Sequence, residues 1–226
     1  MLLVDKPAGW TSFDAVNYVR KQVAAAEDKK PKNVKVGHTG TLDPFATGLL
    51  ILLIGKEYTR RAGEFSKLDK TYEVTMRFGA TSTTGDPEGE ITPVSDQQPT
   101  ETELQTALKK FVGEIDQIPP AYSAIKIDGQ RAYKLARAGK EVKMESRKVT
   151  INSLELTDYT YPEVKFTADV SSGTYIRTLA EDLGKALNTG AYTTGLRRTK
   201  ISNYSLDDAT TIDKLDKFIQ ISHDVQ

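Results

Sequence analysis

The feature that most restricts how this chain can fold is a continuous apolar run, Leu49–Ile54, bounded by Gly48 and Gly55. A run of this kind has no polar face to turn towards water, so it has to be buried. It is far too short to span a bilayer, which takes about 20 apolar residues in a helix. The run therefore predicts a fully buried strand in the interior of a folded domain.

The other elements follow from periodicity and from start and stop signals. Tyr72–Phe78 alternates between apolar and polar residues, which is typical of a strand with one buried face. Thr11 with Asp14, and Thr100 with Glu103, resemble capping boxes at the starts of two helices. Further strands are predicted at Leu2–Asp5, Val149–Leu156, Val164–Val170 and Tyr192–Arg198, and further helices at Ala132–Ala138, Thr174–Leu187 and Thr211–Ile221.

These strands and helices mix without a strict strand–helix–strand alternation. The pattern predicts an α/β (α+β) fold with a mixed, largely antiparallel central sheet flanked by helices and loops. The length of 226 residues is ample for a buried core, and we find no internal repeat.

Composition limits the cellular compartment that the protein fits and the kinds of disulfide or metal site that it can form. The chain has no Cys, which excludes disulfides and thiolate metal sites and fits a reducing cytoplasm. The N-terminus lacks a basic segment followed by a long apolar one, so we expect no signal peptide, no membrane association and a cytoplasmic protein. His38 and His223 are far apart in sequence, and no cluster has metal-ligand spacing, so we expect no metal.

Charge is balanced in number but segregated along the chain. The 31 basic and 31 acidic residues cancel, which alone argues against a nucleic-acid partner. However, Lys126–Lys148 holds eight Lys or Arg against three acids, and Asp86–Asp116 holds eight acids against two Lys. A neutral protein with such segregation can present one basic face to a phosphate backbone, although a solvated surface is the simpler interpretation of any one run.

The segment richest in chemistry is Gly37–Leu50, with the sequence GHTGTLDPFATGLL. Its glycines allow sharp bends and a close approach to a ligand. Asp43 is its only ionisable residue besides His38, and Pro44 restricts the backbone directly after it. We interpret Asp43 as a candidate catalytic carboxylate, with a plain Asp-Pro turn as the alternative.

Two further segments carry candidate residues. In Ser171–Gly184, Tyr175 and Arg177 stand where a glycine loop enters a helix. An Arg beside an Asp would keep that Asp ionised and nucleophilic, whereas the alternative is a surface ion pair with a packed Tyr. Tyr72, at the start of the alternating strand, could stack on a base, although a Tyr in the core is the commoner case.

Seven segments, in order along residues 2–204, together resemble one family. They are LLVDKPAGWTS, GHTGTLDPFATGLL, DKTYEV, TTGDPEGE, PPAYSAIKIDGQRAYKLARAG, SSGTYIRTLAEDLG and GLRRTKISNY. The chain resembles the TruB family, the tRNA pseudouridine-55 synthases of bacteria. The resemblance implies the pseudouridine synthase fold and conversion of a uridine in the tRNA T loop to pseudouridine, without a cofactor.

The resemblance also implies residue roles. Asp43 would be the catalytic carboxylate and Arg177 would pair with it. Tyr72 would stack on the target uracil, Tyr175 would act near the base as a proton acceptor or positioning group, and Leu196 would form part of the apolar pocket wall. The residues that would contact RNA or support the site are Lys6, His38, Lys70, Lys126, Arg131, Arg137 and Arg197.

The organisation that the resemblance implies is a single catalytic domain over residues 1–226. The sequence leaves the oligomeric state open, and nothing in it suggests more than a monomer. A basic RNA-binding insertion at about 119–147 would close over the tRNA T-stem loop. Bacterial members usually carry a C-terminal PUA domain as well, and we expect none within these residues. Asp43 could attack the ribose C1′, attack the uracil C6, or promote formation of a glycal.

Two other functions share features with this sequence. A non-catalytic RNA-binding or tRNA-folding protein is the stronger alternative, and Asp43, Tyr175 and Arg177 argue against it. An aspartyl phosphotransferase is disfavoured, because Phe45 stands where its motif needs a second Asp.

Overall fold

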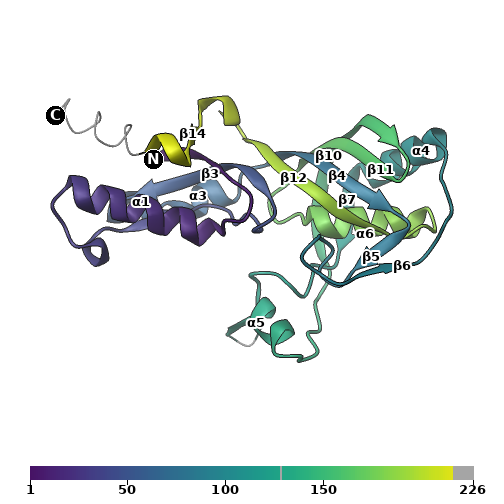
Figure 1. The fold of residues 1–226 in the computed structure, drawn as a ribbon, viewed down its shortest axis with the longest axis horizontal. Coiled ribbons are helices and arrows are strands. Elements are labelled where there is room, and N and C mark those ends of the chain that lie inside the picture. The colour runs from purple at the N-terminus through teal and green to yellow at the C-terminus, as the bar shows by residue number, and fades with distance from the viewer. Residues whose placement is uncertain (128, 216–226) are drawn as a thin grey trace. The chain divides into compact units, whose positions relative to one another are not determined.

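The computed structural model describes residues 1–127 and 129–215 (Figure 1). The chain divides into two compact units, of which unit 1 contains Met1–Tyr72 and the residues from Leu196 onward, and unit 2 contains Glu73–Gly195. Strands β4 (Lys70–Phe78) and β12 (Ala191–Ile201) pass from one unit into the other. Action of the whole chain as a single catalytic domain stays a prediction.

Unit 1 is a small mixed sheet with helices on it. Its other elements are β1 (Leu2–Lys6), α1 (Ser12–Ala26), β2 (Val36–His38), β3 (Thr47–Ile54), α2 (Lys56–Thr59), α3 (Ala62–Ser66), β13 (Tyr204–Ser205), β14 (Thr210–Thr211) and the 3-10 turns Pro31–Asn33, Leu206–Asp208 and Ile212–Lys214. β3 pairs antiparallel with β1 and β2 and parallel with the end of β12, and β14 pairs parallel with β1.

β3 is the centre of unit 1, and it is buried on both faces. Leu50 and Leu52 join a core cluster with the apolar side chains of α1, which lies along one face of the sheet (Figure 1). Leu49, Ile51 and Leu53 join a second cluster on the other face, together with side chains such as Phe65. The buried strand predicted from the continuous apolar run is confirmed.

Unit 2 is a twisted sheet whose strands run in the order β12, β4, β11, β10, β7. Its elements besides β4 and β12 are β5 (Ala80–Ser82), β6 (Ile91–Pro93), α4 (Glu101–Phe111), β7 (Gly113–Gln117), β8 (Lys126–Ile127), β9 (Gln130–Arg131), α5 (Ala132–Arg137), β10 (Arg147–Thr160), β11 (Glu163–Val170) and α6 (Ile176–Ala186). β10 pairs antiparallel with both β11 and β7, so the predicted mixed, largely antiparallel α/β fold is confirmed.

Local signals placed several elements correctly. Alternate residues of β4 are buried, as the alternation between Tyr72 and Phe78 predicts. Both capping boxes are present. The side chains of Thr11 and Thr100 accept a hydrogen bond from the N–H of the third helical residue, and the threonine N–H donates to the carboxylate of that residue. The helix α6 lies within the range predicted at Thr174–Leu187, and its buried apolar side chains are Ile176, Leu179, Ala180 and Leu183.

Other elements differ from the prediction. β7, α2 and α3 were not predicted, and β10 extends to Thr160 rather than ending at Leu156. The predicted final helix begins differently, because Thr211 pairs in β14 and Ile212–Lys214 form a 3-10 turn. Residues 216–221 of that helix, and His223, lie outside the described residues. No helix of the described residues has the length and apolar character needed to cross a membrane.

Candidate active site

Asp43 lies in unit 1, in the loop of residues 39–46 between β2 and β3. The expected turn is present, since the Asp43 carbonyl accepts a hydrogen bond of 3.1 Å from the Ala46 N–H, with Pro44 at the second position of the turn. The Asp43 side chain is half-buried. The loop therefore holds a carboxylate at the surface of a well-packed unit, which is compatible with a catalytic role.

The backbone on both sides of Asp43 is tied down by polar side chains. Ser12 Oγ donates to the Leu42 carbonyl at 3.1 Å and accepts from the Leu42 N–H at 2.8 Å, and Ser12 is only 2% exposed. On the other side, the Pro44 carbonyl accepts from the Gly9 N–H at 2.8 Å and from Lys6 Nζ at 3.4 Å. Buried polar groups with such reciprocal partners rigidify the segment between them.

A third anchor comes from the far end of the chain. Arg198 of β12 is fully buried, and it donates from Nε to the Leu49 carbonyl at 2.7 Å and from Nη2 to the Gly40 carbonyl at 3.0 Å. Gly48 lets β12 approach this closely, because a Cβ there would lie 2.3 Å from the Arg198 carbonyl oxygen. The φ of Gly48 is +104°, a backbone conformation that residues other than glycine rarely adopt.

The two lysines predicted to support the site are buried. Lys6 is 0% exposed, and its Nζ also donates to the carbonyls of Pro7 and Trp10. Lys70 donates to the carbonyls of Ser66 and Leu68. Burial, together with the positive charge of Arg198, lowers the pKa of Lys70 to about 8. The burial of both lysines favours a supporting role over direct phosphate contact, and only Lys6 has a hydrogen bond to the Asp43 loop among those described above. The RNA role of both lysines stays a prediction.

The remaining candidates of unit 1 occupy its strands. Tyr72 lies on the buried face of β4 and is 7% exposed. His38 belongs to β2 and pairs with Leu52. Leu196 and Arg197 lie in β12 and are half-buried, and the Arg197 guanidinium forms an ion pair of 2.8 Å with Asp5. Their functions in stacking, pocket formation and RNA contact stay predictions.

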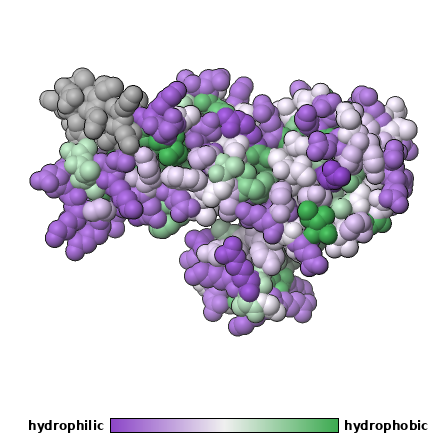
Figure 2. Space-filling model, viewed as in Figure 1, coloured by the Kyte–Doolittle hydropathy of each residue, from purple (hydrophilic) through white to green (hydrophobic). Residues whose placement is uncertain are grey.

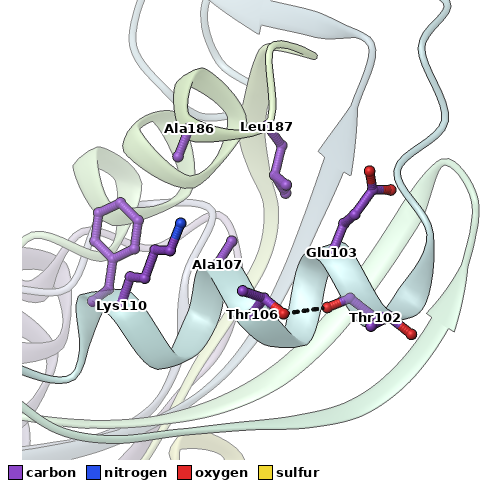
Figure 3. A pocket seen from close by; sticks show the side chains of 8 residues that line it. Thr102, Glu103, Thr106, Ala107, Lys110, Ala186 and Leu187 are labelled. Carbon is purple, nitrogen blue, oxygen red and sulfur yellow. Dashed lines mark hydrogen bonds between the residues drawn. The ribbon is translucent and has the colours of Figure 1, made fainter.

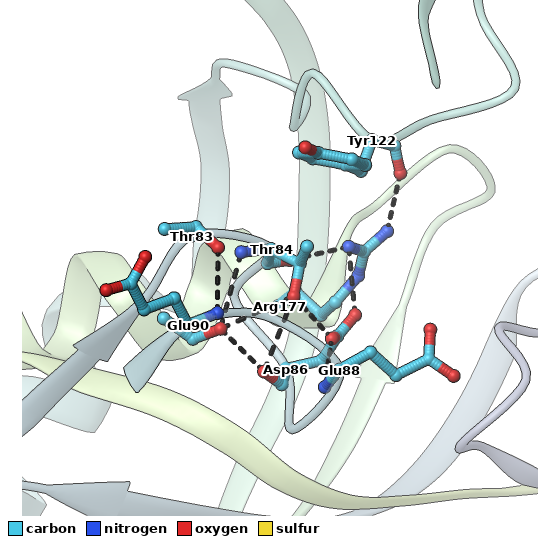
Figure 4. A network of polar contacts seen from close by, with 8 residues as sticks. Thr83, Thr84, Asp86, Glu88, Glu90, Tyr122 and Arg177 are labelled. Carbon is cyan, nitrogen blue, oxygen red and sulfur yellow. Dashed lines mark hydrogen bonds and ion pairs between the residues drawn. The ribbon is translucent and has the colours of Figure 1, made fainter. Parts of the chain in front are cut away.

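Unit 2 holds Arg177 in a buried polar network, shown in Figure 4. Arg177 Nη1 donates to the Thr84 carbonyl at 2.6 Å and pairs with Asp86 Oδ2 at 3.2 Å, while Nη2 donates to the Tyr122 carbonyl at 2.9 Å. The Arg177 and Asp86 side chains are 5% and 4% exposed. Removing one partner of such a pair typically costs about 3–5 kcal/mol, so the pair fixes the guanidinium.

Asp86 is itself held in a tight turn. Its Oδ1 accepts from Thr84 Oγ1 at 2.6 Å and from the Glu88 N–H at 3.0 Å (Figure 4). Glu181, on α6, faces the same turn, and burial raises the pKa of its carboxyl group. The Gly/Thr-rich loop of residues 83–90 thus positions the carboxylate that meets Arg177.

The predicted basic insertion belongs to unit 2. It carries the hairpin β8–β9 and α5, and its surface in Figure 2 is mostly hydrophilic. Lys126, Arg131 and Arg137 are all exposed. Arg137 lies over the ring of Tyr133, with 5.7 Å between its Cζ and the ring centroid. The segment has the exposed cations that a phosphate contact needs, and the contact itself stays a prediction.

The structure therefore brings the candidate residues together in two groups. Asp43 and Tyr72 belong to unit 1, while Tyr175 and Arg177 belong to unit 2. The pairing of Arg177 with Asp43 stays a prediction. A groove of about 260 Å³ between α4 and α6, shown in Figure 3, is lined by none of these four residues.

Several supporting residues were missed from the sequence. Ser12 and Arg198 hold the loop of Asp43, and Asp86 holds Arg177. Asp86 had a usable signal, because it lies in the segment TTGDPEGE that the family resemblance includes. Within residues 1–127 and 129–215, no three or more His, Asp or Glu side chains are grouped to hold a metal ion. Independence of metal stays a prediction.

Comparison with known proteins assigns nearly the whole chain to one family. Residues 28–176 match the model of the TruB family pseudouridylate synthase N-terminal domain, and residues 177–225 match that of the tRNA pseudouridylate synthase B C-terminal domain. A tRNA pseudouridine synthase B of Burkholderia mallei (strain NCTC 10247) is 46% identical over 226 residues, which cover 100% of this chain and 72% of the relative. The relative named tRNA pseudouridine synthase B in Flavobacterium johnsoniae is 45% identical, with 97% and 96% coverage.

A solved structure shows the same fold. A chain in the crystal structure of a Cbf5-Nop10-Gar1 complex superposes with a TM-score of 0.73 at 27% identity, and the match covers 96% of this chain and 53% of that chain. This chain thus spans about half the length of that protein. The family models, the relatives and the fold agree, and the chain belongs to the TruB family of pseudouridylate synthases.

Proposed function

We propose that this chain isomerises uridine 55 in the T loop of tRNA to pseudouridine, with Asp43 as the catalytic carboxylate. Support comes from the relatives, which are named tRNA pseudouridine synthase B. The observation that carries the residue assignment is the anchoring of the Asp43 loop by Ser12, Lys6 and Arg198. A catalytic group needs a fixed orientation, and four polar contacts to a loop of eight residues supply one.

The chemistry suits a carboxylate. The reaction breaks the C–N glycosidic bond, turns the uracil while it is held, and rejoins it to the ribose through C5. An aspartate can form or stabilise the covalent or oxocarbenium-like species that bond cleavage requires. The net change is an isomerisation, so we expect neither an energy source nor a metal to be needed.

Access to the target requires base flipping. The uridine is stacked inside a folded loop, and extruding it costs a few kcal/mol. In this proposal Tyr72 stacks on the uracil, Leu196 lines its pocket, and Tyr175 acts next to the base. Arg177 pairs with Asp43, and its fixation by Asp86 supports a defined orientation of the guanidinium.

Binding of the T-stem loop rests on charge. The exposed cations of the insertion, among them Lys126, Arg131 and Arg137, would contact phosphates. In unit 1, His38 and Arg197 would contact the T loop of the tRNA. Lys6 and Lys70, which are buried, would support the site from within the protein. The proposal includes a monomer that acts in the cytoplasm.

The decisive test is tritium release from C5-labelled uridine in a tRNA transcript. Wild-type chain should release tritium from a transcript with uridine at position 55 and not from one with cytidine there. Asp43→Asn should bind the tRNA normally and release none, because the amide cannot replace the carboxylate. Asp96→Asn, which removes the same charge from an exposed position, is the matched control.

Each outcome is informative. Full release by Asp43→Asn would remove Asp43 from the chemistry. Equal release from both transcripts would refute the assignment to position 55. Tight binding without release by the wild-type chain would favour the alternative of a non-catalytic RNA-binding or tRNA-folding protein.

A further inference from the structure

Tyr175 occupies a position where tyrosine is a poor choice for local stability. It is the N-cap residue of α6, with extended backbone angles of φ −100° and ψ 109° and no side-chain hydrogen bond to the helix. Ser, Thr, Asp or Asn is favoured at such a position because its oxygen accepts from a helical N–H. The N-caps of α1 and α4 follow that rule with Thr11 and Thr100. α6 departs from it at the residue that the proposed function places next to the base.

A buried amide from another element supplies the missing support. Gln117, the last residue of β7, is 1% exposed. Its Oε1 accepts from the Tyr175 N–H at 2.8 Å, and its Nε2 donates to the Tyr175 carbonyl at 3.1 Å. Both backbone polar groups of Tyr175 are thus held by one planar side chain that is 58 residues away in sequence. The same carbonyl accepts the first helical bond, from the Leu179 N–H at 3.0 Å.

This contact matches what a Gln amide offers and what few other side chains offer. It donates and accepts in one plane, so it can engage a peptide N–H and C=O on the same residue. A buried amide without partners would be costly, which makes the two bonds a strong restraint on where Gln117 and Tyr175 lie. Tyr175 is therefore fixed at the backbone, and its side chain starts from a defined position.

A second contact joins the same two stretches of chain. Arg177, two residues after Tyr175, donates to the carbonyl of Tyr122, five residues after Gln117. The start of α6 is thereby tied twice to residues 117–122, the stretch from which the basic insertion departs.

We propose that Gln117 is a positioning residue for uridine isomerisation, which acts by holding the backbone of Tyr175 so that the Tyr175 side chain meets the flipped base. The inference rests on the proposed function, in which Tyr175 acts next to the uracil. Gln117 itself does not touch the substrate.

The first test compares Gln117→Met, which keeps the volume and removes both hydrogen bonds, with wild type. Single-turnover pseudouridine formation should slow about 10- to 100-fold, as small misplacements of catalytic groups do, while tRNA affinity changes less than about threefold. Gln117→Asn keeps the amide but is one methylene shorter, and it should slow the reaction as well. It also provides a second variant should Gln117→Met fail to fold. Gln105→Met, on the exposed side of α4, is the matched control and should react at the wild-type rate.

The second test separates positioning from general stability through a double-mutant cycle with Tyr175→Phe. If Gln117 acts through Tyr175, Gln117→Met should slow the wild-type enzyme much more than it slows Tyr175→Phe. Equal slowing in both backgrounds, or wild-type rates for folded Gln117 variants, would overturn the proposal. Failure of the proposed function would show differently, as activity retained by Asp43→Asn whatever residue stands at position 117.

Discussion

Ser12→Ala probes whether the loop around Asp43 is held as the structure indicates. The substitution deletes one hydroxyl that makes two hydrogen bonds to Leu42, directly before Asp43. Because Ser12 is 2% exposed, water cannot readily replace the lost partner. The N–H and the carbonyl of Leu42 are then both left without this partner inside the protein.

The expected magnitude follows from those two groups. A buried polar group without a partner costs about 1–3 kcal/mol, and partial relaxation of the loop reduces the sum, so we expect a loss of about 2–3 kcal/mol in the free energy of unfolding. For a chain of this size that corresponds to a fall in Tm of roughly 4–12 °C. The rate should fall about 10-fold or more, because Asp43 loses its fixed orientation.

Thermal unfolding and single-turnover kinetics on the same preparations measure both effects. Ser66→Ala is the control, since its exposed hydroxyl makes a single bond to the Gly63 carbonyl and should contribute little. A Ser12→Ala protein with the wild-type Tm and rate would refute the anchoring argument. Lost stability with an unchanged rate would show that Ser12 supports the fold and not the placement of Asp43.

Three further predictions follow. Gly48→Ala should cost at least about 3 kcal/mol in urea unfolding, because the new Cβ would lie 2.3 Å from the Arg198 carbonyl at a φ of +104°. Lys70 should make the free energy of unfolding rise between pH 8 and 10.5, because its lowered pKa of about 8 means that the unfolded state binds more protons there. The rise is roughly 3 kcal/mol at most and should be missing in Lys70→Met. Replacing Arg131 and Arg137 by Ala should reduce the slope of log affinity against log salt by roughly 1.5–2.

Matched controls sharpen these tests. Gly63→Ala lies within α3, and the added Cβ would point into open space, so the substitution should be neutral or slightly stabilising. A loss of unfolding free energy as large as that of Gly48→Ala would contradict the close-approach argument. Lys67→Met removes an exposed lysine near Lys70 and should leave the pH dependence unchanged. Lys109→Ala on α4 should leave the salt slope unchanged, and an unaltered slope for the Arg131 and Arg137 variants would place RNA binding elsewhere.

Elements with strong local signals could be predicted from the sequence. The capping boxes at Thr11 and Thr100 involve residues three apart, and six consecutive apolar residues predict the burial of β3. β7 has no such signal, because Ile115 is its only large apolar residue. It becomes a strand by pairing with β10, where Ile115 lies opposite Val149. That partner is distant in sequence, and only the folded chain supplies it.

The site divides in the same way. Asp43 stands out because glycines and threonines surround it, and Tyr175 because a glycine loop leads into its helix. Their supports carry no local pattern. Gln117 is one amide among many, and its contact with Tyr175 exists only because β7 and α6 meet in unit 2.

The anchoring of the Gly40 carbonyl by Arg198 spans 158 residues, and it has a consequence for synthesis. The N-terminal portion of the chain leaves the ribosome long before β12 does, since translation proceeds at about 5–20 residues per second. Until Arg198 emerges, the segment around Asp43 lacks one of its tethers. A nascent or prematurely terminated chain that contains Asp43 but not Arg198 is therefore expected to be a poor catalyst, which delays activity until most of the polypeptide has been made.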